Sequence, residues 1–176
     1  MTKTESIVLG GGCFWCLEAA YAQLKGVIKV LPGYAGGSVS NPTYEQVCTG
    51  TTGHVEVVKV TFESDVISLG DIMAVFWTIH DPTSLNRQGG DVGTQYASVA
   101  FYDNETQERI LRDSKTEAQK YLDTPIVTKI EPLDAFYEAE AEHHDYYEKH
   151  PEAAYCQVVI EPKLNKLRDH FAPLLR

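Results

Sequence analysis

A cysteine stands where a glycine-rich turn leads into a predicted helix. The run GGCFWC at residues 11–16 follows a short apolar stretch at residues 6–9, and the apolar residues after it recur at helical spacing. Backbone N–H groups and the positive end of a helix dipole favour negative charge at the start of a helix. We therefore expect the Cys13 thiol to ionise readily and to serve as a nucleophile. The alternative is a small buried cysteine that packs beside Phe14 and Trp15.

Cys13 and Cys16 form a Cys-x-x-Cys pair, which admits three uses. It can be a redox dithiol, half of a zinc site, or a nucleophile with an uninvolved neighbour, and the spacing does not choose among them. A zinc site needs four ligands, but the sequence has no second Cys-x-x-Cys pair and no spaced pair of histidines. The adjacent His143 and His144 would point in different directions on a helix. We therefore expect no metal and no cofactor.

The composition narrows the classes of function. The 176 residues are 43% apolar, which suffices for one domain spanning residues 1–176 with a core of its own. Fifteen basic residues against 25 acidic ones give a net charge of −10, which repels the phosphates of nucleic acid. The sequence has no apolar run near the roughly 18 residues of a membrane span, and its first residues lack a basic-then-apolar leader. We expect a cytoplasmic monomer that binds neither nucleic acid nor membranes.

The apolar periodicity predicts strands and helices without the regular alternation of a doubly wound fold, so we expect the α+β class. The predicted strands are 6–9, 27–34, 54–63, 95–101 and 126–130. The predicted helices are 13–21, a short turn at 44–48, and 72–79, 105–121 and 163–171. A long polar loop at 83–94 is expected to be functional. In strand 54–63, the alternation places Glu56 on one face with Val58, Val60 and Phe62.

Six short motifs occur along the chain: Gly12-Cys13-Phe14-Trp15, Gly33-Tyr34-Ala35-Gly36-Gly37, Pro42-Thr43-Tyr44-Glu45-Gln46-Val47, Thr52-Gly53-His54-Val55-Glu56, His80-Asp81-Pro82-Thr83 and Asp91-Val92-Gly93-Thr94-Gln95-Tyr96. In order and spacing, the chain resembles the A-type peptide methionine sulfoxide reductases from about residue 6 to residue 165. The resemblance implies a single-domain α/β sandwich with a ferredoxin-like plait core. It also implies thiol-dependent reduction of methionine S-sulfoxide, in proteins and as the free amino acid, and thus protein repair after oxidative damage.

The resemblance implies a role for seven side chains. The catalytic set is Cys13, Glu56, Tyr44 and Tyr96. Cys13 attacks the sulfoxide sulfur and Glu56 protonates the oxygen, while the two tyrosines donate hydrogen bonds to that oxygen. The substrate-binding set is Phe14, Trp15 and Asp91. The two aromatic rings enclose the methyl group of the substrate, and the aspartate orients substrate or solvent.

This chemistry makes physical demands that the residues can meet. Reducing a sulfoxide requires a soft nucleophile for the sulfur and a proton for the oxygen, so a thiolate and an acid must coexist. A glutamic acid stays protonated near neutral pH when apolar neighbours remove water from it. Glu56 alone would be interpreted as a solvated strand carboxylate, and it becomes a candidate acid only in the company of the other motifs.

After oxygen transfer, Cys13 would be a sulfenic acid that a second thiol converts to a disulfide, and we expect thioredoxin to reduce that disulfide. Cys156 follows Tyr155 at a position where many members of the family carry the resolving cysteine, so it is our first choice. Cys16 is our second choice, because disulfides between residues i and i+3 are feasible at helix starts. We expect Cys48 to be buried packing.

One segment departs from the family pattern. Residues 139–146, which we expect to be helical, resemble the family's Ala-Glu-x-x-His-Gln-x-Tyr, with His144 in place of the glutamine.

Three other interpretations compete with sulfoxide reduction. The Cys-x-x-Cys pair could serve a general thiol–disulfide oxidoreductase, or the cysteines could hold zinc or pack in a structural module. A papain-like hydrolase also places cysteine near tryptophan, but its partner histidine and asparagine have no recognisable context here.

Overall fold

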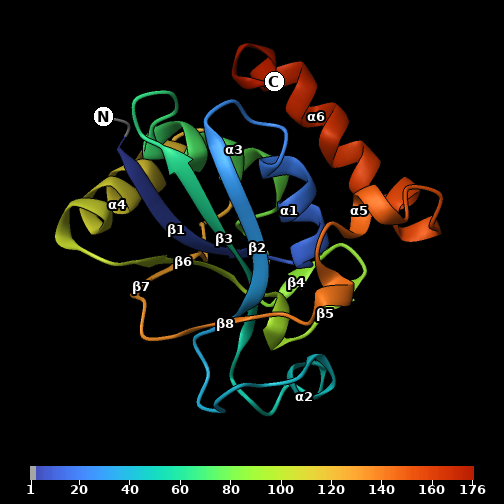
Figure 1. Ribbon diagram of the computed structural model, residues 1–176. Helices are drawn as coiled ribbons and strands as arrows, with labels where there is room; N and C mark the ends of the chain where they lie inside the picture. Colours follow the sequence, from blue (N-terminus) through green and yellow to red (C-terminus); the bar gives the residue numbers. More distant parts are fainter. Residues whose placement is uncertain (1–2) are drawn as a thin grey trace.

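The fold is built on one mixed sheet in a computed structural model that describes residues 3–176 (Figure 1). Met1 and Thr2, the first residues of the expected domain, lie outside the described part. The strands are β1 (Thr4–Gly11), β2 (Val27–Ala35), β3 (Val55–Glu63), β6 (Ser98–Tyr102), β7 (Lys129–Pro132) and β8 (Phe136–Glu138). Their order in the sheet is β7-β6-β1-β3-β2-β8, and every neighbouring pair is antiparallel except β6 and β7.

The sheet is strongly curled. A flat sheet of six strands would separate its two edges by about 24 Å. The edge strands β7 and β8 are nevertheless joined by residues 133–135 alone, a connection that spans at most about 14 Å. The two edges must therefore approach each other, and the concave face encloses a small apolar cluster of its own. This cluster consists of Val8, Ala35, Val55, Val57, Val99 and Phe101.

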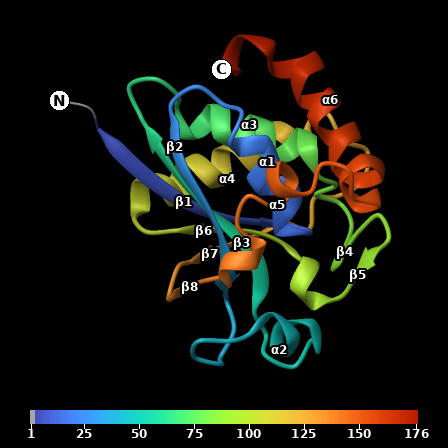
Figure 2. The same ribbon diagram turned by 45° about the vertical axis from the view of Figure 1, so that its right-hand side comes forward.

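The larger core lies on the other face, between the sheet and the helices. The longer helices are α1 (Phe14–Tyr21), α3 (Leu69–Ile79), α4 (Glu105–Gln119) and α6 (Glu161–Phe171), and the short ones are α2 (Tyr44–Cys48) and α5 (Tyr146–Lys149). Figures 1 and 2 show α1, α3 and α4 on the same side of the sheet, with α6 beside them and α2 beyond the ends of β2 and β3. Val58, Val60 and Phe62 belong to this core, so the predicted alternation of β3 is confirmed and puts Glu56 on the helix-facing side.

Most predicted elements are present, with shifts in three places. The loop at 83–94 contains a small hairpin of β4 (Arg87–Gln88) and β5 (Asp91–Val92), and Thr94–Tyr96 forms a 3-10 turn where a strand was predicted. The strand predicted at 126–130 begins only at Lys129. The prediction of a helix over 139–146 is wrong. This segment forms only a short 3-10 turn, Ala141–His143. Helix α5 starts after Asp145, because that residue takes a left-handed conformation with φ 55°.

Within residues 3–176, no helix is both long enough and apolar enough to span a membrane.

Replacement of a core side chain should separate buried from exposed positions. Phe62 in β3 is fully buried, so Phe62→Ala should lower the free energy of unfolding by about 3–5 kcal/mol. Tyr121, which is 81% exposed, is the control. Tyr121→Ala should change the free energy of unfolding by less than about 0.5 kcal/mol. Urea unfolding measures both, and equal losses would contradict this placement of the core.

Candidate active site

The turn between β1 and α1 places Cys13 at the start of a helix. Gly12 has φ 96°, and a Cβ atom on it would come within 2.7 Å of Gln88 Cγ, so only glycine fits. Cys13 is the N-cap of α1 and its side chain is 7% exposed. The predicted sequence from strand through glycine turn to helix is therefore present, and it brings a nearly buried sulfur to the edge of the helix-facing core.

Glu56 supplies a buried carboxyl group to the same place. Its side chain is 1% exposed, and its Oε1 accepts a hydrogen bond of 3.2 Å from the backbone N–H of Phe14, the residue after Cys13. Its Oε2 is buried and has no hydrogen-bond partner within residues 3–176. Burial raises the pKa of Glu56 to about 8, the Phe14 N–H lowers it, and the negative charges of Asp91 and Cys16 raise it further. The carboxyl group is therefore protonated at neutral pH.

The two thiols of the Cys-x-x-Cys pair interact, and their pKa values move in opposite directions. Burial raises the pKa of Cys13, and contact with Cys16 and the charge of Glu56 add to the effect. The interaction with the Cys13 thiol lowers the pKa of Cys16 to about 6. The prediction that Cys13 ionises readily is wrong for the substrate-free protein, because burial raises its pKa and outweighs its place at the helix start.

Tyr44 and Tyr96 lie beside Glu56. Tyr44 begins α2, where Thr43 caps the helix and the Tyr44 N–H donates a 3.0 Å hydrogen bond to Glu140 Oε2. Tyr96 ends the 3-10 turn before β6. Burial raises the pKa of both hydroxyl groups, and the charge of Glu56 raises each further. Both hydroxyl groups therefore stay protonated and can donate hydrogen bonds next to the carboxyl group.

Aromatic rings surround the start of α1. Phe14 is fully buried, with its ring centroid 6.4 Å from that of Tyr44. Trp15 is partly buried and stacks on Tyr146 with ring centroids 3.7 Å apart and an interplanar angle of 7°. The rings of Tyr155 and Trp15 lie nearly perpendicular, with their centroids 5.6 Å apart. These rings form an apolar surface beside Cys13.

Asp91 is linked to the thiol pair through Tyr155. The Tyr155 hydroxyl donates a 2.7 Å hydrogen bond to Asp91 Oδ2 and lies 3.6 Å from Cys16 Sγ. The sequence motifs pointed to Asp91 but not to Tyr155. Tyr155 directly precedes Cys156, which the sequence did single out. Its contact with α1 could not be predicted, because it depends on how the C-terminal segment folds back onto that helix.

The other two cysteines differ in exposure. Cys156 is fully buried and begins a π-helical turn, Cys156–Ile160, that runs into α6. Cys48, at the end of the short helix α2, is exposed. The expectation that Cys48 is buried packing is therefore wrong, because a five-residue helix beyond the sheet ends in solvent.

Three side chains of the kinds that bind metals lie close together: Glu140, Glu142 and His143. One possible ligand atom from each lies within 4.8 Å of the other two. The Glu140 oxygens already accept hydrogen bonds from the Tyr34 hydroxyl and the Tyr44 N–H. This carboxylate therefore positions the two tyrosines. The family motif at residues 139–146 includes Glu140, but no role was predicted for it.

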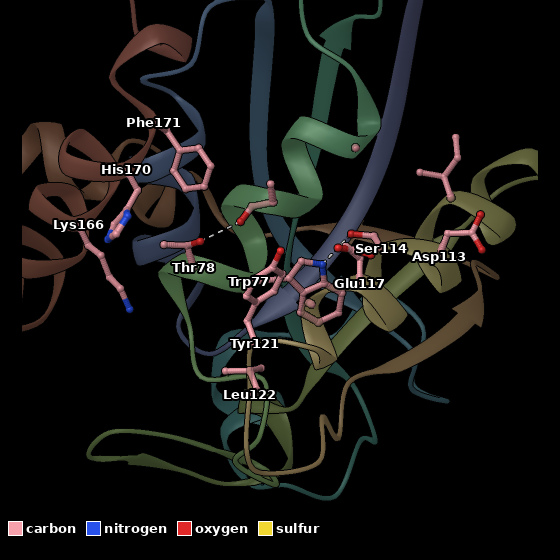
Figure 3. Close-up of a pocket in the computed structure, with 14 residues that line it drawn as sticks. Trp77, Thr78, Asp113, Ser114, Glu117, Tyr121, Leu122, Lys166, His170 and Phe171 are labelled. Atoms are coloured by element: carbon pink, nitrogen blue, oxygen red, sulfur yellow. Dashed lines mark hydrogen bonds between the residues drawn. The ribbon is translucent and has the colours of Figure 1, made fainter.

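The largest cavity that we describe, about 850 Å³, lies elsewhere, between α3, α4 and α6 (Figure 3). Trp77, Ile110, Tyr121 and Phe171 line it, and its lining includes none of the residues of the candidate site.

Comparison with known proteins identifies the family of this chain. The family model described as peptide methionine sulfoxide reductase matches residues 5–174. The peptide methionine sulfoxide reductase MsrA of Saccharolobus solfataricus is 54% identical over 167 residues, covering 95% of this chain and 94% of the relative. That of Thermus thermophilus is 52% identical over 172 residues, covering 98% of each chain.

Solved structures give the same result. Mxr1 from Saccharomyces cerevisiae in reduced form matches with a TM-score of 0.83 and 36% identity over 88% of this chain and 90% of that chain. The same yeast protein matches with a TM-score of 0.65 in an unusual oxidized form (34% identity, 85% and 83% coverage). In complex with Trx2 its TM-score is 0.59 (27% identity, 82% and 85% coverage). The chain therefore belongs to the peptide methionine sulfoxide reductase family, as a peptide-methionine (S)-S-oxide reductase.

Proposed function

We propose that Cys13 reduces methionine S-sulfoxide, in oxidised proteins and as the free amino acid, with Glu56 as the proton donor. The observation that carries the proposal is the buried Glu56 carboxyl group. It has a pKa of about 8 and an unpartnered oxygen within residues 3–176, and it is held by the N–H of the residue next to Cys13. A neutral acid beside a thiol is what the sulfoxide oxygen requires.

The proton and electron changes balance across the site. Cys16, with its lowered pKa, takes the proton of the Cys13 thiol as the Cys13 sulfur attacks the sulfoxide sulfur. Glu56 gives its proton to the oxygen. A bond has now formed between the two sulfur atoms. The protonated oxygen passes from the substrate sulfur to the Cys13 sulfur, so the S–O bond of the substrate and the S–S bond break while an S–O bond forms at Cys13. Methionine leaves, its sulfur is reduced by two electrons, and Cys13 is oxidised by two electrons to a sulfenic acid. Tyr44 and Tyr96 donate hydrogen bonds to the oxygen during this step.

The S epimer is selected by three different subsites around one sulfur atom. Phe14 and Trp15 enclose the methyl group, while the tyrosines and Glu56 receive the oxygen. Asp91 lies at the rim, where its bond to Tyr155 supports a role in orienting the third substituent of the substrate.

We propose Cys156 as the thiol that converts the sulfenic acid to a disulfide, with loss of water, and Cys16 as the alternative. Cys156 is buried at a π-helical turn, and such helix irregularities are frequent at functional sites. The solved complex of the yeast relative Mxr1 with Trx2 supports thioredoxin as the reductant.

The fold and location follow the same family. The order β6-β1-β3-β2, with α1 after β1 and α3 after β3, supports a ferredoxin-like plait core within one domain of residues 1–176. A mechanism that consumes thiols favours the reducing cytoplasm.

A general thiol–disulfide oxidoreductase is a weaker proposal. Cys13 is 7% exposed and Cys16 is 1% exposed, so a disulfide on another protein has little access to either sulfur. A sulfoxide at the end of a flexible methionine side chain needs less room.

Removal of the nucleophile is the first test. Cys13→Ser should abolish turnover of a methionine S-sulfoxide substrate, since a hydroxyl group at this position is neither soft nor ionised. Cys48→Ser, which removes an exposed thiol, is the matched control and should keep turnover within about twofold of the wild type. Full turnover by Cys13→Ser would remove the proposal.

Glu56→Gln should lower the rate of the reaction and raise the stability of the fold. Without a positioned acid, sulfenic acid formation in a single turnover should slow by about 10²-fold or more. The folded-state pKa of about 8 lies above the usual 4.5, so the wild type loses stability as pH rises from 4.5 to 8. The amide does not ionise, and at pH 7 the variant should be more stable by about 2–3 kcal/mol in urea unfolding.

The pH profile provides the check on Glu56. The wild-type single-turnover rate should fall by about tenfold per pH unit above pH 8, as the acid loses its proton, and this fall should vanish in Glu56→Gln. Glu63→Gln, on the same strand, is the control and should retain the wild-type profile. An unchanged rate in Glu56→Gln would exclude this residue as the acid.

The disulfide that forms after one turnover identifies the resolving thiol. Without reductant, peptide mapping should find a bond between Cys13 and Cys156, and Cys156→Ser should accumulate sulfenic acid at Cys13. A bond between Cys13 and Cys16 as the sole product would replace Cys156 by Cys16 in the mechanism.

A further inference from the structure

His143 is a buried polar side chain that the proposed mechanism does not use. Only 6% of its surface is exposed, and neither of its ring nitrogens has a hydrogen-bond partner within residues 3–176. Each nitrogen of an imidazole ring is a donor or an acceptor, and burying such an atom without a partner costs free energy. A ligand that contacts a ring nitrogen would remove this cost.

Three aromatic rings hold the imidazole ring of His143 in place. Its centroid lies 4.5 Å from that of Tyr44, 5.4 Å from that of Phe14 and 5.8 Å from that of Trp15. Within the described part of the chain, these neighbours supply no hydrogen bond to either nitrogen. The ring is therefore fixed by apolar contacts, and its nitrogens are left for a partner of another kind.

Glu140 and Glu142 bring carboxylate oxygens to the imidazole ring. One possible ligand atom from each of Glu140, Glu142 and His143 lies within 4.8 Å of the other two, so all three lie within about 2.8 Å of a common point, which is 4.8 Å divided by √3. Bonds from zinc to nitrogen and to carboxylate oxygen are about 2.0–2.2 Å long. The three atoms need to close in by less than about 1 Å, and the exposed side chain of Glu142 is free to make most of this movement.

The Glu140 carboxylate can bind an ion without giving up its other contacts. Its Oε1 accepts a hydrogen bond of 3.1 Å from the Tyr34 hydroxyl, and its Oε2 accepts one of 3.0 Å from the Tyr44 N–H. A carboxylate offers about four lone-pair positions, so about two remain. The two hydrogen bonds orient the carboxylate, as outer partners commonly do for metal ligands.

All three ligands come from one short segment of the chain. Glu140 directly precedes the 3-10 turn Ala141–His143, and the His143 N–H donates a 3.0 Å hydrogen bond to the Glu140 carbonyl oxygen. This turn already holds the two residues together, so binding an ion between their side chains orders little additional chain.

The kinds of ligand favour zinc among the common metal ions. An imidazole nitrogen combined with carboxylate oxygens suits Zn²⁺, whereas Ca²⁺ and Mg²⁺ take oxygen ligands. Three protein ligands leave the fourth position of a tetrahedral site to water. The net charge of −10 also attracts cations to the chain.

We propose that Glu140, Glu142 and His143 form a binding site for one Zn²⁺ ion, with a water molecule as the fourth ligand. No metal was expected from the sequence, because this cluster contains neither a second Cys-x-x-Cys pair nor a spaced pair of histidines. The site lies beside the rings of Phe14 and Trp15, but its affinity for zinc does not depend on the proposed reduction of sulfoxides.

The experiment titrates the full chain with zinc chloride by calorimetry. Cys13, Cys16 and Cys48 are first changed to serine, so that their thiols do not compete for the ion. We expect this serine background to bind about one zinc ion per chain. Adding Glu142→Gln or His143→Phe should weaken binding by about tenfold or more, because even the loss of an outer partner of a ligand costs about that much.

His144→Phe is the matched control for His143→Phe. The Nε2 of His144 contacts the Ala139 carbonyl oxygen and lies outside the cluster, so its replacement should leave the affinity for zinc unchanged. Glu142 is exposed, so Glu142→Gln remains informative even if His143→Phe fails to fold. The proposal is overturned if Glu142→Gln binds zinc as tightly as the serine background, or if that background binds no zinc.

Thermal unfolding provides a second readout of the same site. An ion that binds only the folded chain raises Tm, and zinc at about 100 times its Kd should raise the Tm of the serine background by about 5–10 °C. With Glu142→Gln, the same zinc concentration should raise Tm by about half as much or less. Equal rises in the two proteins would place the ion at other ligands and contradict the site.

Discussion

The hydrogen bond from the Phe14 N–H to Glu56 Oε1 is the contact on which the site depends. It joins the backbone of the first residue of α1 to the side chain of Glu56 on the central strand β3, so the acid is held beside the residue that follows the nucleophile. It is also a weak stabiliser of the charged form, being one neutral donor against nearly complete burial. The carboxyl group is therefore held in place and remains protonated, and both properties are needed in a proton donor.

The fold makes that contact possible by placing the end of strand β1 beside the start of strand β3. β1 delivers Cys13 at its end, while the neighbouring strand β3 runs in the opposite direction and carries Glu56 near its start. Antiparallel pairing thus places the end of one strand beside the beginning of the other. Gly12 allows the chain to turn into α1 without a Cβ that would overlap Gln88. The hairpin and 3-10 turn at residues 87–96 close the same side with Asp91 and Tyr96.

The sequence predicted this arrangement where the information is local. The alternation in β3 gave the face of Glu56, and the capping pattern around Thr43 and Gln46 is consistent with a helix at 44–48 as predicted. The errors arose where distant residues decide. The pKa of Cys13 depends on burial and on a glutamate 43 positions along the chain, and a helix-start argument contains neither. Residues 139–146 have helical composition, yet Asp145 takes a left-handed conformation and interrupts the helix.

Glu56 and Glu140 show how hydrogen-bond donors and burial together decide the charge of a carboxyl group. Glu56 is 1% exposed and accepts one hydrogen bond, from the Phe14 N–H, so burial dominates and raises its pKa to about 8. Glu140 is only partly buried. Its oxygens accept hydrogen bonds from the Tyr34 hydroxyl and the Tyr44 N–H, and these donors outweigh the effect of burial and lower its pKa. The protonated carboxyl group and the charged carboxylate that positions Tyr44 therefore lie in one site because their surroundings differ.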